Sequence, residues 1–365
     1  MNIIGIRRGA AGFAAILVAL CCALAGGSTA GAASPSARLT VESFASPSSF
    51  TAGGPCTSAD PTEASFAATD CDVYVVTVRN VGSVPTDGSQ ITLSDVLPAG
   101  MTVHRTNFFW SGLLENLGEF LCPGVSECVF PIALAPDQTL EMYLFVTVPA
   151  GVTGPLRSTA TVSGGGVAEA AASSQTPVGS TPVFGFASFN ALMAGSDGEP
   201  DTRAGGHPYE FTTTIDMNNE RRLAAESQVV HTSVRDPKDI VVDLPVGLAG
   251  SALATPQCTF AQLGAGAGCP ADTIIGHIVT SPEGLASINS PVYNITPEHG
   301  FAAQFGFIDK LNGTHVLSAS VVPTPQGYVL RTITTDVPQI TLDRIVVRLF
   351  GNPVEKNLSG NTPVA

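Results

Sequence analysis

The stretch Asp72-Val-Tyr-Val-Val-Thr-Val-Arg79 decides the fold class of this chain. It consists mainly of β-branched and aromatic residues, which favour strands, and it stops at Asn80-Val81-Gly82, where asparagine and glycine favour a turn. We therefore predict a strand at 72–79. In an antiparallel sheet such a strand buries one face and exposes the other.

Similar runs follow along the chain, each ended by a turn signal. Ile91–Leu97 stops at Pro98-Ala99-Gly100, and Leu140–Val148 stops at Pro149-Ala150-Gly151. Short strands separated by frequent turns are typical of β-sandwiches, and no amphipathic helix of ordinary length stands out. The chain is therefore predicted to be all-β. Further predicted strands are Leu156–Val162, Tyr209–Met217, Asp239–Leu244, Thr273–Thr280, Ala302–Ile308, His315–Val322, Tyr328–Thr335 and Ile340–Phe350.

The N-terminal segment has the features of a secretory signal. Arg7 and Arg8 are the only charged residues before Arg38, an apolar run covers Gly9–Ala25, and Ala30-Gly31-Ala32 fits a small-residue cleavage pattern. These are the three regions of a signal peptide, and the apolar run is shorter than the about 20 residues that span a membrane. We predict a cleaved signal peptide at residues 1–32. The mature chain is then secreted or extracellular, able to stay associated with the cell surface, and has no transmembrane anchor.

The charge of the mature chain excludes two classes of partner. Without Arg7 and Arg8 it keeps 14 basic against 30 acidic residues, a net charge of −16. Nucleic-acid binding needs basic patches that neutralise phosphates, and anionic lipid surfaces attract polybasic segments. We expect no nucleic-acid partner and no adhesion to anionic membranes by charge alone.

Six of the eight cysteines lie outside the predicted signal peptide. An even number in an exported chain indicates disulfides, and fifteen pairings are formally possible. A zinc site is the alternative, but the mature chain has no Cys-x-x-Cys pair. Proximity in sequence favours the pairs Cys56–Cys71, Cys122–Cys128 and Cys258–Cys269.

A change of composition separates the two halves of the chain. Residues 164–181 are rich in Gly, Ala, Ser and Pro, with no large apolar side chain between Val167 and Val178. Such a segment is typical of a linker between two domains. The predicted organisation is a signal peptide at 1–32, a first β-sandwich at 38–165, a linker at 166–182, a second β-sandwich at 183–350 and a polar tail at 351–365.

Several motifs of the first half occur in the order seen in a known family. They are Val75–Gly82, Ile91–Gly100, Pro136–Leu140, Val148–Gly151 and Ser158–Ser163. Over residues 38–165 this series resembles the DUF11 conserved repeat, whose members have an immunoglobulin-like sandwich and occur, often in tandem, in secreted and cell-surface proteins of bacteria and archaea. The resemblance implies an immunoglobulin-like sandwich for the first half. Together with the strands predicted in the second half, the predicted fold is all-β, with two immunoglobulin-like or β-sandwich domains in tandem. The insert at Phe108–Cys128 departs from that compact repeat.

The second half carries motifs of its own. They are Asp201–Pro208, Lys238–Pro245, Pro256–Cys258, Cys269–Asp272 and Pro291–Asn294. Together they resemble a recurrent segment of secreted actinobacterial proteins of unknown function. Neither resemblance transfers a catalytic residue.

Motifs for the common enzyme chemistries are missing. The sequence has no Gly-x-Ser-x-Gly, no His-Glu-x-x-His and no Walker loop. Oxidised cysteines cannot act as nucleophiles. His207, in a glycine-rich stretch beside an acidic loop, could be a general base, but a turn histidine that satisfies backbone groups is the favoured interpretation. We predict that the protein is not an enzyme and has no catalytic residue.

The acidic loop is itself a candidate metal site. Asp197, Glu199 and Asp201 alternate with Gly198 and Pro200, and calcium takes several oxygen ligands from flexible loops. The loop lacks the spacing of an EF-hand, so ordinary turn chemistry is the alternative. Calcium at this loop is the one cofactor kept as a hypothesis.

One aromatic group offers a second candidate surface. Trp110, with Phe108 and Phe109, could form an exposed patch that binds sugar or protein. Packing in the sandwich core, or as a cover beneath the Cys122–Cys128 loop, is the favoured alternative.

These observations favour a secreted, non-enzymatic module of the cell envelope or extracellular space with a structural, adhesive or binding-surface role. Its partner would be an envelope component, a glycan or a protein. The first alternative is a carbohydrate- or calcium-dependent binding protein that uses Asp197–Asp201 or Trp110. The second is a secreted hydrolase with an unrecognised site, in which His207 or His277 would lie beside a carboxylate and a hydroxyl.

Overall fold

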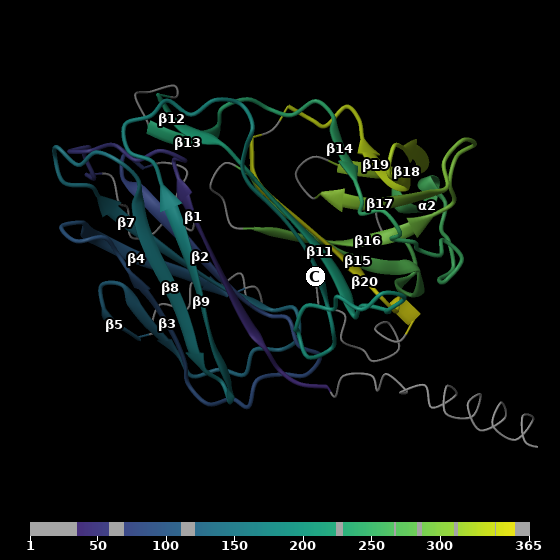
Figure 1. The fold of residues 1–365 in the computed structure, drawn as a ribbon, viewed down its shortest axis with the longest axis horizontal. Coiled ribbons are helices and arrows are strands. Elements are labelled where there is room, and N and C mark those ends of the chain that lie inside the picture. Colours follow the sequence, from purple (N-terminus) through teal and green to yellow (C-terminus); the bar gives the residue numbers. More distant parts are fainter. Residues whose placement is uncertain are drawn as a thin grey trace, which may run out of the picture. The chain divides into compact units, whose positions relative to one another are not determined.

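The predicted strand at 72–79 is β2 (Asp72–Asn80), and it lies in the interior of a sheet. The computed structural model describes residues 35–57, 69–110, 121–223, 229–265, 268–282, 287–309, 313–339 and 341–354. Within this part, β2 belongs to a four-stranded antiparallel sheet with the order β1-β2-β7-β4 (Figure 1). Its other strands are β1 (Leu39–Ser46), β7 (Thr139–Thr147) and β4 (Thr102–Trp110).

A five-stranded antiparallel sheet packs on one face of this sheet and completes a sandwich. Its order is β5-β6-β3-β8-β9. Alternate residues of β2, such as Tyr74 and Val76, point into the shared core, where they meet Phe130 from the opposite sheet. The strands of the five-stranded sheet are β5 (Leu121–Gly124), β6 (Glu127–Phe130), β3 (Ile91–Val96), β8 (Leu156–Gly164) and β9 (Val167–Thr176).

The expectation that β2 exposes one face is wrong. Val73 and Val75, which point away from the sandwich core, are buried in a second apolar cluster with Tyr143 and Phe145 of β7. Strands that are buried on both faces read as near-continuous apolar runs. The unbroken run Val73–Val76 is the sequence signal of this double burial.

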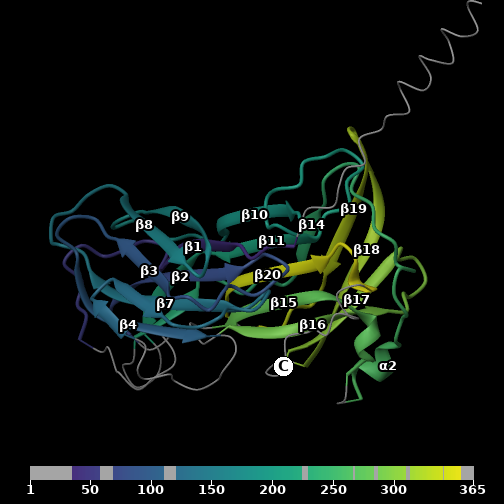
Figure 2. The same ribbon diagram turned by 90° about the horizontal axis from the view of Figure 1, so that it is seen from below.

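The second half of the chain forms a nine-stranded antiparallel sheet with the order β10-β11-β20-β15-β16-β17-β18-β19-β14 (Figures 1 and 2). The strands predicted beyond residue 208 all lie in it, so the all-β prediction is confirmed. Their bounds are β10 (Phe186–Ala194), β11 (Glu210–Met217), β14 (Ile240–Asp243), β15 (Ile274–Pro282), β16 (Ile288–Ile295), β17 (Ala303–Asp309), β18 (Gly313–Thr324), β19 (Gly327–Thr334) and β20 (Leu342–Phe350).

This sheet curls over on itself. The strand β11 is second in its order and β14 is last, yet Phe211 of β11 and Val242 of β14 line the same cavity. The concave face carries the apolar cluster that includes Ile278, Phe307 and Ile345. The opposite face of β11, β20 and β15 is turned toward β1, β2 and β7, because residues of all six strands line a second cavity.

Two smaller elements complete the described part of the chain. The hairpin β12 (Asn219–Leu223) and β13 (Val229–Ser233) contacts the end of β1, where Ser46 Oγ lies 2.8 Å from His231 Nδ1. A single helical turn, α2 (Phe260–Leu263), is capped at Thr259 and precedes a 3-10 turn at Ala271–Thr273.

The structure confirms all three disulfides that proximity favours. They are Cys56–Cys71, Cys122–Cys128 and Cys258–Cys269. The last pair encloses α2 and packs with Leu263 and Ile295 in a small apolar cluster. Because each loop closed is short, every disulfide restrains a local segment and none joins the two halves of the chain.

The linker predicted at 166–182 is wrong for its first part. Residues 167–176 form β9, which pairs with β8 along its whole length. Ala170 and Ala172 pack on the sandwich core while their neighbours are exposed, so small side chains conceal the alternation that marks a strand. The chain from Pro35 onward groups as one unit, and the proposed domain boundaries stay predictions.

The edge strand β10 has an unusual composition. Among the described strands its only neighbour in the sheet order is β11, although at its end the Met193 carbonyl accepts from the Asp201 backbone N–H at 2.8 Å. The strand carries no charged residue and exposes 60% of Phe186 and 53% of Phe189. Phe184, just before it, is also exposed. Natural edge strands usually carry charges or prolines that prevent further pairing, and β10 has neither.

Some predictions fall on residues that the structure does not describe. The signal peptide at 1–32 lies outside the described residues, as does the tail from 355 onward. In the part that is described, no helix has the length and apolar character needed to cross a membrane.

Candidate functional site

A cavity of about 280 Å³ lies between the four-stranded sheet and the nine-stranded sheet. Its walls come from β1, β2 and β7 on one side and from β10, β11, β15 and β20 on the other. Charged side chains line both walls, although only 13% of the chain is charged. This concentration of charge in the interior makes the cavity the candidate site.

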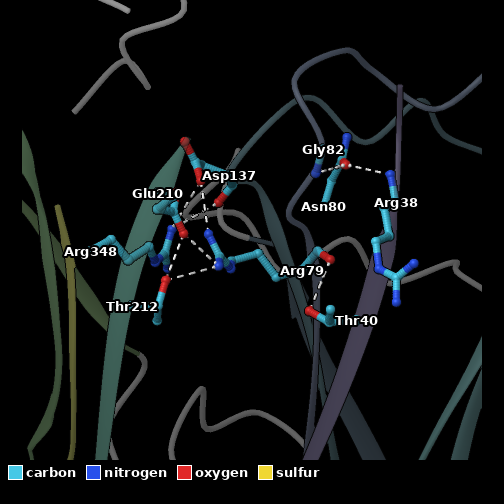
Figure 3. A network of polar contacts seen from close by, with 9 residues as sticks. All are labelled: Arg38, Thr40, Arg79, Asn80, Gly82, Asp137, Glu210, Thr212 and Arg348. Atoms are coloured by element: carbon cyan, nitrogen blue, oxygen red, sulfur yellow. Dashed lines mark hydrogen bonds and ion pairs between the residues drawn. The ribbon is translucent and has the colours of Figure 1, made fainter. Parts of the chain in front are cut away.

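Arg79 is the centre of the site (Figure 3). Its guanidinium donates to Asp137 Oδ1 at 2.9 Å and to Glu210 Oε1 at 2.7 Å, and it also contacts Thr212 Oγ1 at 3.3 Å. Arg79 ends the apolar run of β2, whereas Glu210 and Thr212 begin β11. The arginine therefore joins the two sheets.

Asp137 owes its position to the turn before β7. It adopts a left-handed φ of 65°, and its backbone N–H donates to the Asn80 carbonyl at 2.9 Å. The Asn80 side chain in turn accepts from the backbone N–H groups of Arg38 and Gly82 (Figure 3). Aspartate tolerates this left-handed conformation better than most residues. The turn thus holds the carboxylate against Arg79.

Arg348 approaches the same carboxylate from β20. Its Nη1 donates to the Asp137 carbonyl at 3.3 Å and lies 3.8 Å from Asp137 Oδ1 (Figure 3). Four residues earlier on the same face of β20, Arg344 pairs with Glu42 of β1 and lies 3.5 Å from Asp216 Oδ1. Three arginines and their carboxylates therefore bridge β1, β2, β11 and β20.

Burial changes the acid–base properties of these arginines. It lowers the pKa of Arg344 to about 10, helped by the charge of Arg348, and lowers the pKa of Arg348 to about 10, helped by Arg79. Burial also acts on Arg79, but Glu210 and Asp137 outweigh it and raise its pKa. All three guanidiniums stay protonated at neutral pH.

Glu141 of β7 completes the charged lining. Its carboxyl accepts from Tyr143 Oη at 2.6 Å and from Ser287 Oγ at 2.9 Å. Burial raises the pKa of Glu141 and raises that of Tyr143 well above its usual range. A buried acid with two hydroxyl donors holds position and does not present a base to solvent.

A second buried cluster links the β12–β13 hairpin to β2. Arg221 pairs with Asp72, whose pKa burial raises to about 7. Burial, with the charge of Arg221, lowers the pKa of His231 to about 3, so this histidine is neutral at physiological pH. Both clusters join segments that are far apart in the sequence.

The three carboxylates of the predicted calcium loop have other partners. Asp201 binds the Arg203 guanidinium through both oxygens, at 3.0 and 2.8 Å. Glu199 pairs with Arg38, and Asp197 accepts from the Glu199 backbone N–H at 3.0 Å. Among the described residues no three His, Cys, Asp or Glu side chains are grouped as metal ligands. Calcium at this loop stays a prediction.

The other sequence candidates lie apart from the charged cavity. The hypothesis of an exposed aromatic patch is wrong, and the favoured alternative of core packing holds. Phe108 and Trp110 pack on the sandwich core, and Phe109 lies edge-to-face on Tyr143 with 5.1 Å between ring centroids. His207 is exposed and His277 is buried beside Phe350, 5.7 Å between ring centroids. Neither histidine lines the charged cavity or the cavity on the concave face of the nine-stranded sheet.

Sequence reasoning missed the residues that form the charged site. A signal was present, because Glu141, Arg344 and Arg348 lie within mainly apolar strands and Arg79 lies at the end of another. Charged residues are rarely buried without a partner, so charges within an apolar strand indicate pairing across an interface. The identity of each partner could not be predicted.

Comparison with known proteins gives remote structural similarities. The chain matches no protein-family model and no curated protein sequence. The bacterial hydrophobin BslA aligns over 39% of this chain and 99% of its own, at 16% identity and a TM-score of 0.22. BcpA, the major pilin subunit of Bacillus cereus, aligns over 86% of this chain and 66% of its own, at 10% identity and a TM-score of 0.23. The pilus backbone RrgB of Streptococcus pneumoniae aligns over 85% and 93%, at 10% identity and a TM-score of 0.23.

Proposed function

We propose that the chain is a secreted, non-enzymatic module of the cell envelope or extracellular space, with a structural, adhesive or binding-surface role. The observation that carries the proposal is the charged network, in which each arginine contacts a carboxylate. Arg79 of β2 pairs with Glu210 of β11, and Arg344 of β20 pairs with Glu42 of β1. A hydrolytic site needs a nucleophile beside a base that substrate can reach, whereas these groups hold two sheets together.

The disulfides support the same role. All six cysteines outside the predicted signal peptide are paired, and disulfides persist in oxidising spaces outside the cytosol. The resemblance of residues 38–165 to the DUF11 repeat, found in secreted and surface proteins, belongs to this proposal. The partner is an envelope component, a glycan or a protein.

Localisation combined with binding tests the proposal. Producing cells are separated into cytosol, envelope and medium, and mass spectrometry measures the N-terminus and the thiol state of the chain. We expect cleavage before Ala33, six oxidised cysteines, and protein in the envelope or the medium. Purified protein is then sedimented with isolated envelopes, with reduced and alkylated protein as the unfolded control.

Two results would overturn the proposal. An intact Met1 with reduced thiols in the cytosol excludes secretion. Folded, oxidised protein that sediments with neither envelopes nor extracellular matrix excludes the adhesive and binding roles.

A further inference from the structure

The concave face of the nine-stranded sheet encloses a second cavity, of about 110 Å³. One wall comes from β11, β15 and β20, with Phe211, Ile278 and Val347, and the other includes Val242 of β14 and Leu317 of β18. Apart from four threonines, the only polar lining residues are Asp309 and His315. The chemistry of this cavity is therefore opposite to that of the charged one.

The packing around this cavity is looser than in the sandwich. Most buried side chains of the sandwich core, such as Tyr74 and Met142, have no exposed surface. Every buried side chain of the concave cluster keeps some exposure, from 1% at Val292 to 7% at Phe307, and Phe305, Leu317 and Val347 are only half-buried. Protein interiors are normally close-packed, so apolar walls left partly open indicate a space for an apolar group.

The volume limits what can enter. Typical pockets for drug-sized ligands have about 300–1,000 Å³, whereas an apolar cavity of about 150 Å³ accepts benzene. A cavity of about 110 Å³ is too small for an extended peptide with its side chains. It suits part of a short alkyl chain.

The two polar lining residues, Asp309 and His315, determine which polar group at the end of such an alkyl chain can bind. The His315 ring stacks on Phe307 with 5.0 Å between centroids, and burial lowers the pKa of His315, so the imidazole is neutral at physiological pH. Asp309, which is 4% exposed, lies close enough to influence this histidine. A neutral hydrogen-bonding group is favoured here, because a charged head would lose its hydration against the largely apolar lining.

We propose that this cavity binds a short alkyl chain with a neutral polar head, such as a hydroxyl group beside His315. The chain would lie against Ile278, Val292 and Leu317. This inference does not depend on the proposed envelope role, because it concerns an internal site of the second sheet. It adds a small-molecule binding activity that the sequence did not suggest.

Methyl NMR with 1-octanol as the probe tests the site. We expect saturable shifts of the methyl signals of Ile278, Val292 and Leu317. Val242→Trp fills the cavity, whereas Val241→Trp, on the same strand but 54% exposed, places the same ring outside it. The dissociation constant should rise by about tenfold or more in the first variant, a loss of about 1.4 kcal/mol, and stay within about twofold in the second.

Two further arms keep the test decisive. If Val242→Trp loses its dispersed methyl spectrum, Thr334→Leu narrows the same cavity with a smaller side chain. Octanoate replaces octanol to test the head, and weaker binding of octanoate is expected.

Three outcomes would overturn the proposal. The first is shifts that do not saturate or that Val242→Trp leaves unchanged. The second is octanoate binding as well as octanol, which rejects the neutral head. The third is the same shifts appearing without octanol as protein concentration rises, which assigns the cavity to a second copy of the chain.

Discussion

At the scale of a single residue, Asp95 is the clearest source of pH dependence. It lies on β3 and is 2% exposed, and burial raises its pKa from 3.8 to about 7. The folded protein therefore holds a proton that the unfolded chain has lost between about pH 4 and 7. Stability is highest below this window and falls as pH rises through it.

We expect Asp95→Asn to be more stable than the wild type at pH 8, by a few kcal/mol at about 1.4 kcal/mol per pKa unit. The amide reproduces the neutral acid, so the two proteins should differ little at pH 4. Urea unfolding at both pH values measures the difference. Asp272→Asn, at an exposed aspartate, is the control and should change little. An Asp95→Asn protein that is less stable at pH 8 would show a paired, ionised Asp95.

At the scale of an element, the turn of the β8–β9 hairpin consists of glycines with positive φ, and Gly164 is the most tightly enclosed of them. Gly164 has a φ of +92°, and a Cβ added there would lie 1.9 Å from the Gln90 carbonyl oxygen of the segment before β3. Gly154 has nearly the same φ, +90°, but a Cβ there would meet nothing within 4 Å. The two positions share backbone strain and differ in available space.

Gly154→Ala should therefore cost about 1–2 kcal/mol of unfolding free energy, the strain of a left-handed alanine. Gly164→Ala should cost clearly more, because the β3 backbone must also move. Urea unfolding at constant pH compares them. Equal losses in the two variants would mean that the hairpin shifts freely and that its register is not fixed at this turn.

The sequence predicted the individual strands better than any other feature of the fold. The strands β2, β7 and β20 are rich in β-branched and aromatic residues, and each stands out as a run of such residues that ends at a turn signal. The strand β9 was not predicted, because its alanines and serines give almost no difference in hydrophobicity between its two faces. Disulfide pairs followed from short spacing, since only nearby cysteines needed to be considered.

At the scale of the whole molecule, the sequence did not predict which distant residues come into contact. Arg79 and Glu210 are 131 residues apart, and nothing local indicates that they meet. Their pairing depends on how two sheets face each other, which follows from the complete fold. The same applies to the apolar cavity, because it exists only when β11 and β14 approach across the curled sheet.

The charged network makes its own prediction at this scale. Arg79→Met leaves Asp137 and Glu210 buried without their main cation, so unfolding free energy should fall by about 3–5 kcal/mol. Arg157→Met, at an exposed arginine of β8, is the matched control. Fluorescence of Trp110 follows the sandwich and circular dichroism follows the whole chain. Coincident transitions with unchanged stability in Arg79→Met would show that the sheets are held by apolar packing alone.

The largely unpaired edge of β10 determines whether the protein aggregates at high concentration. The excess of negative charge keeps copies apart, but at physiological ionic strength this repulsion reaches only about 8 Å. Once it is screened, another strand can pair with the part of this edge that precedes Met193, which is how fibrous aggregates begin. Salt is therefore expected to make solutions turbid in light scattering. Phe189→Lys should keep them clear, whereas Val321→Lys, a charge placed on an exposed residue of β18, should not. Turbidity that persists in the Phe189→Lys variant would show that aggregation starts at a surface other than the edge of β10.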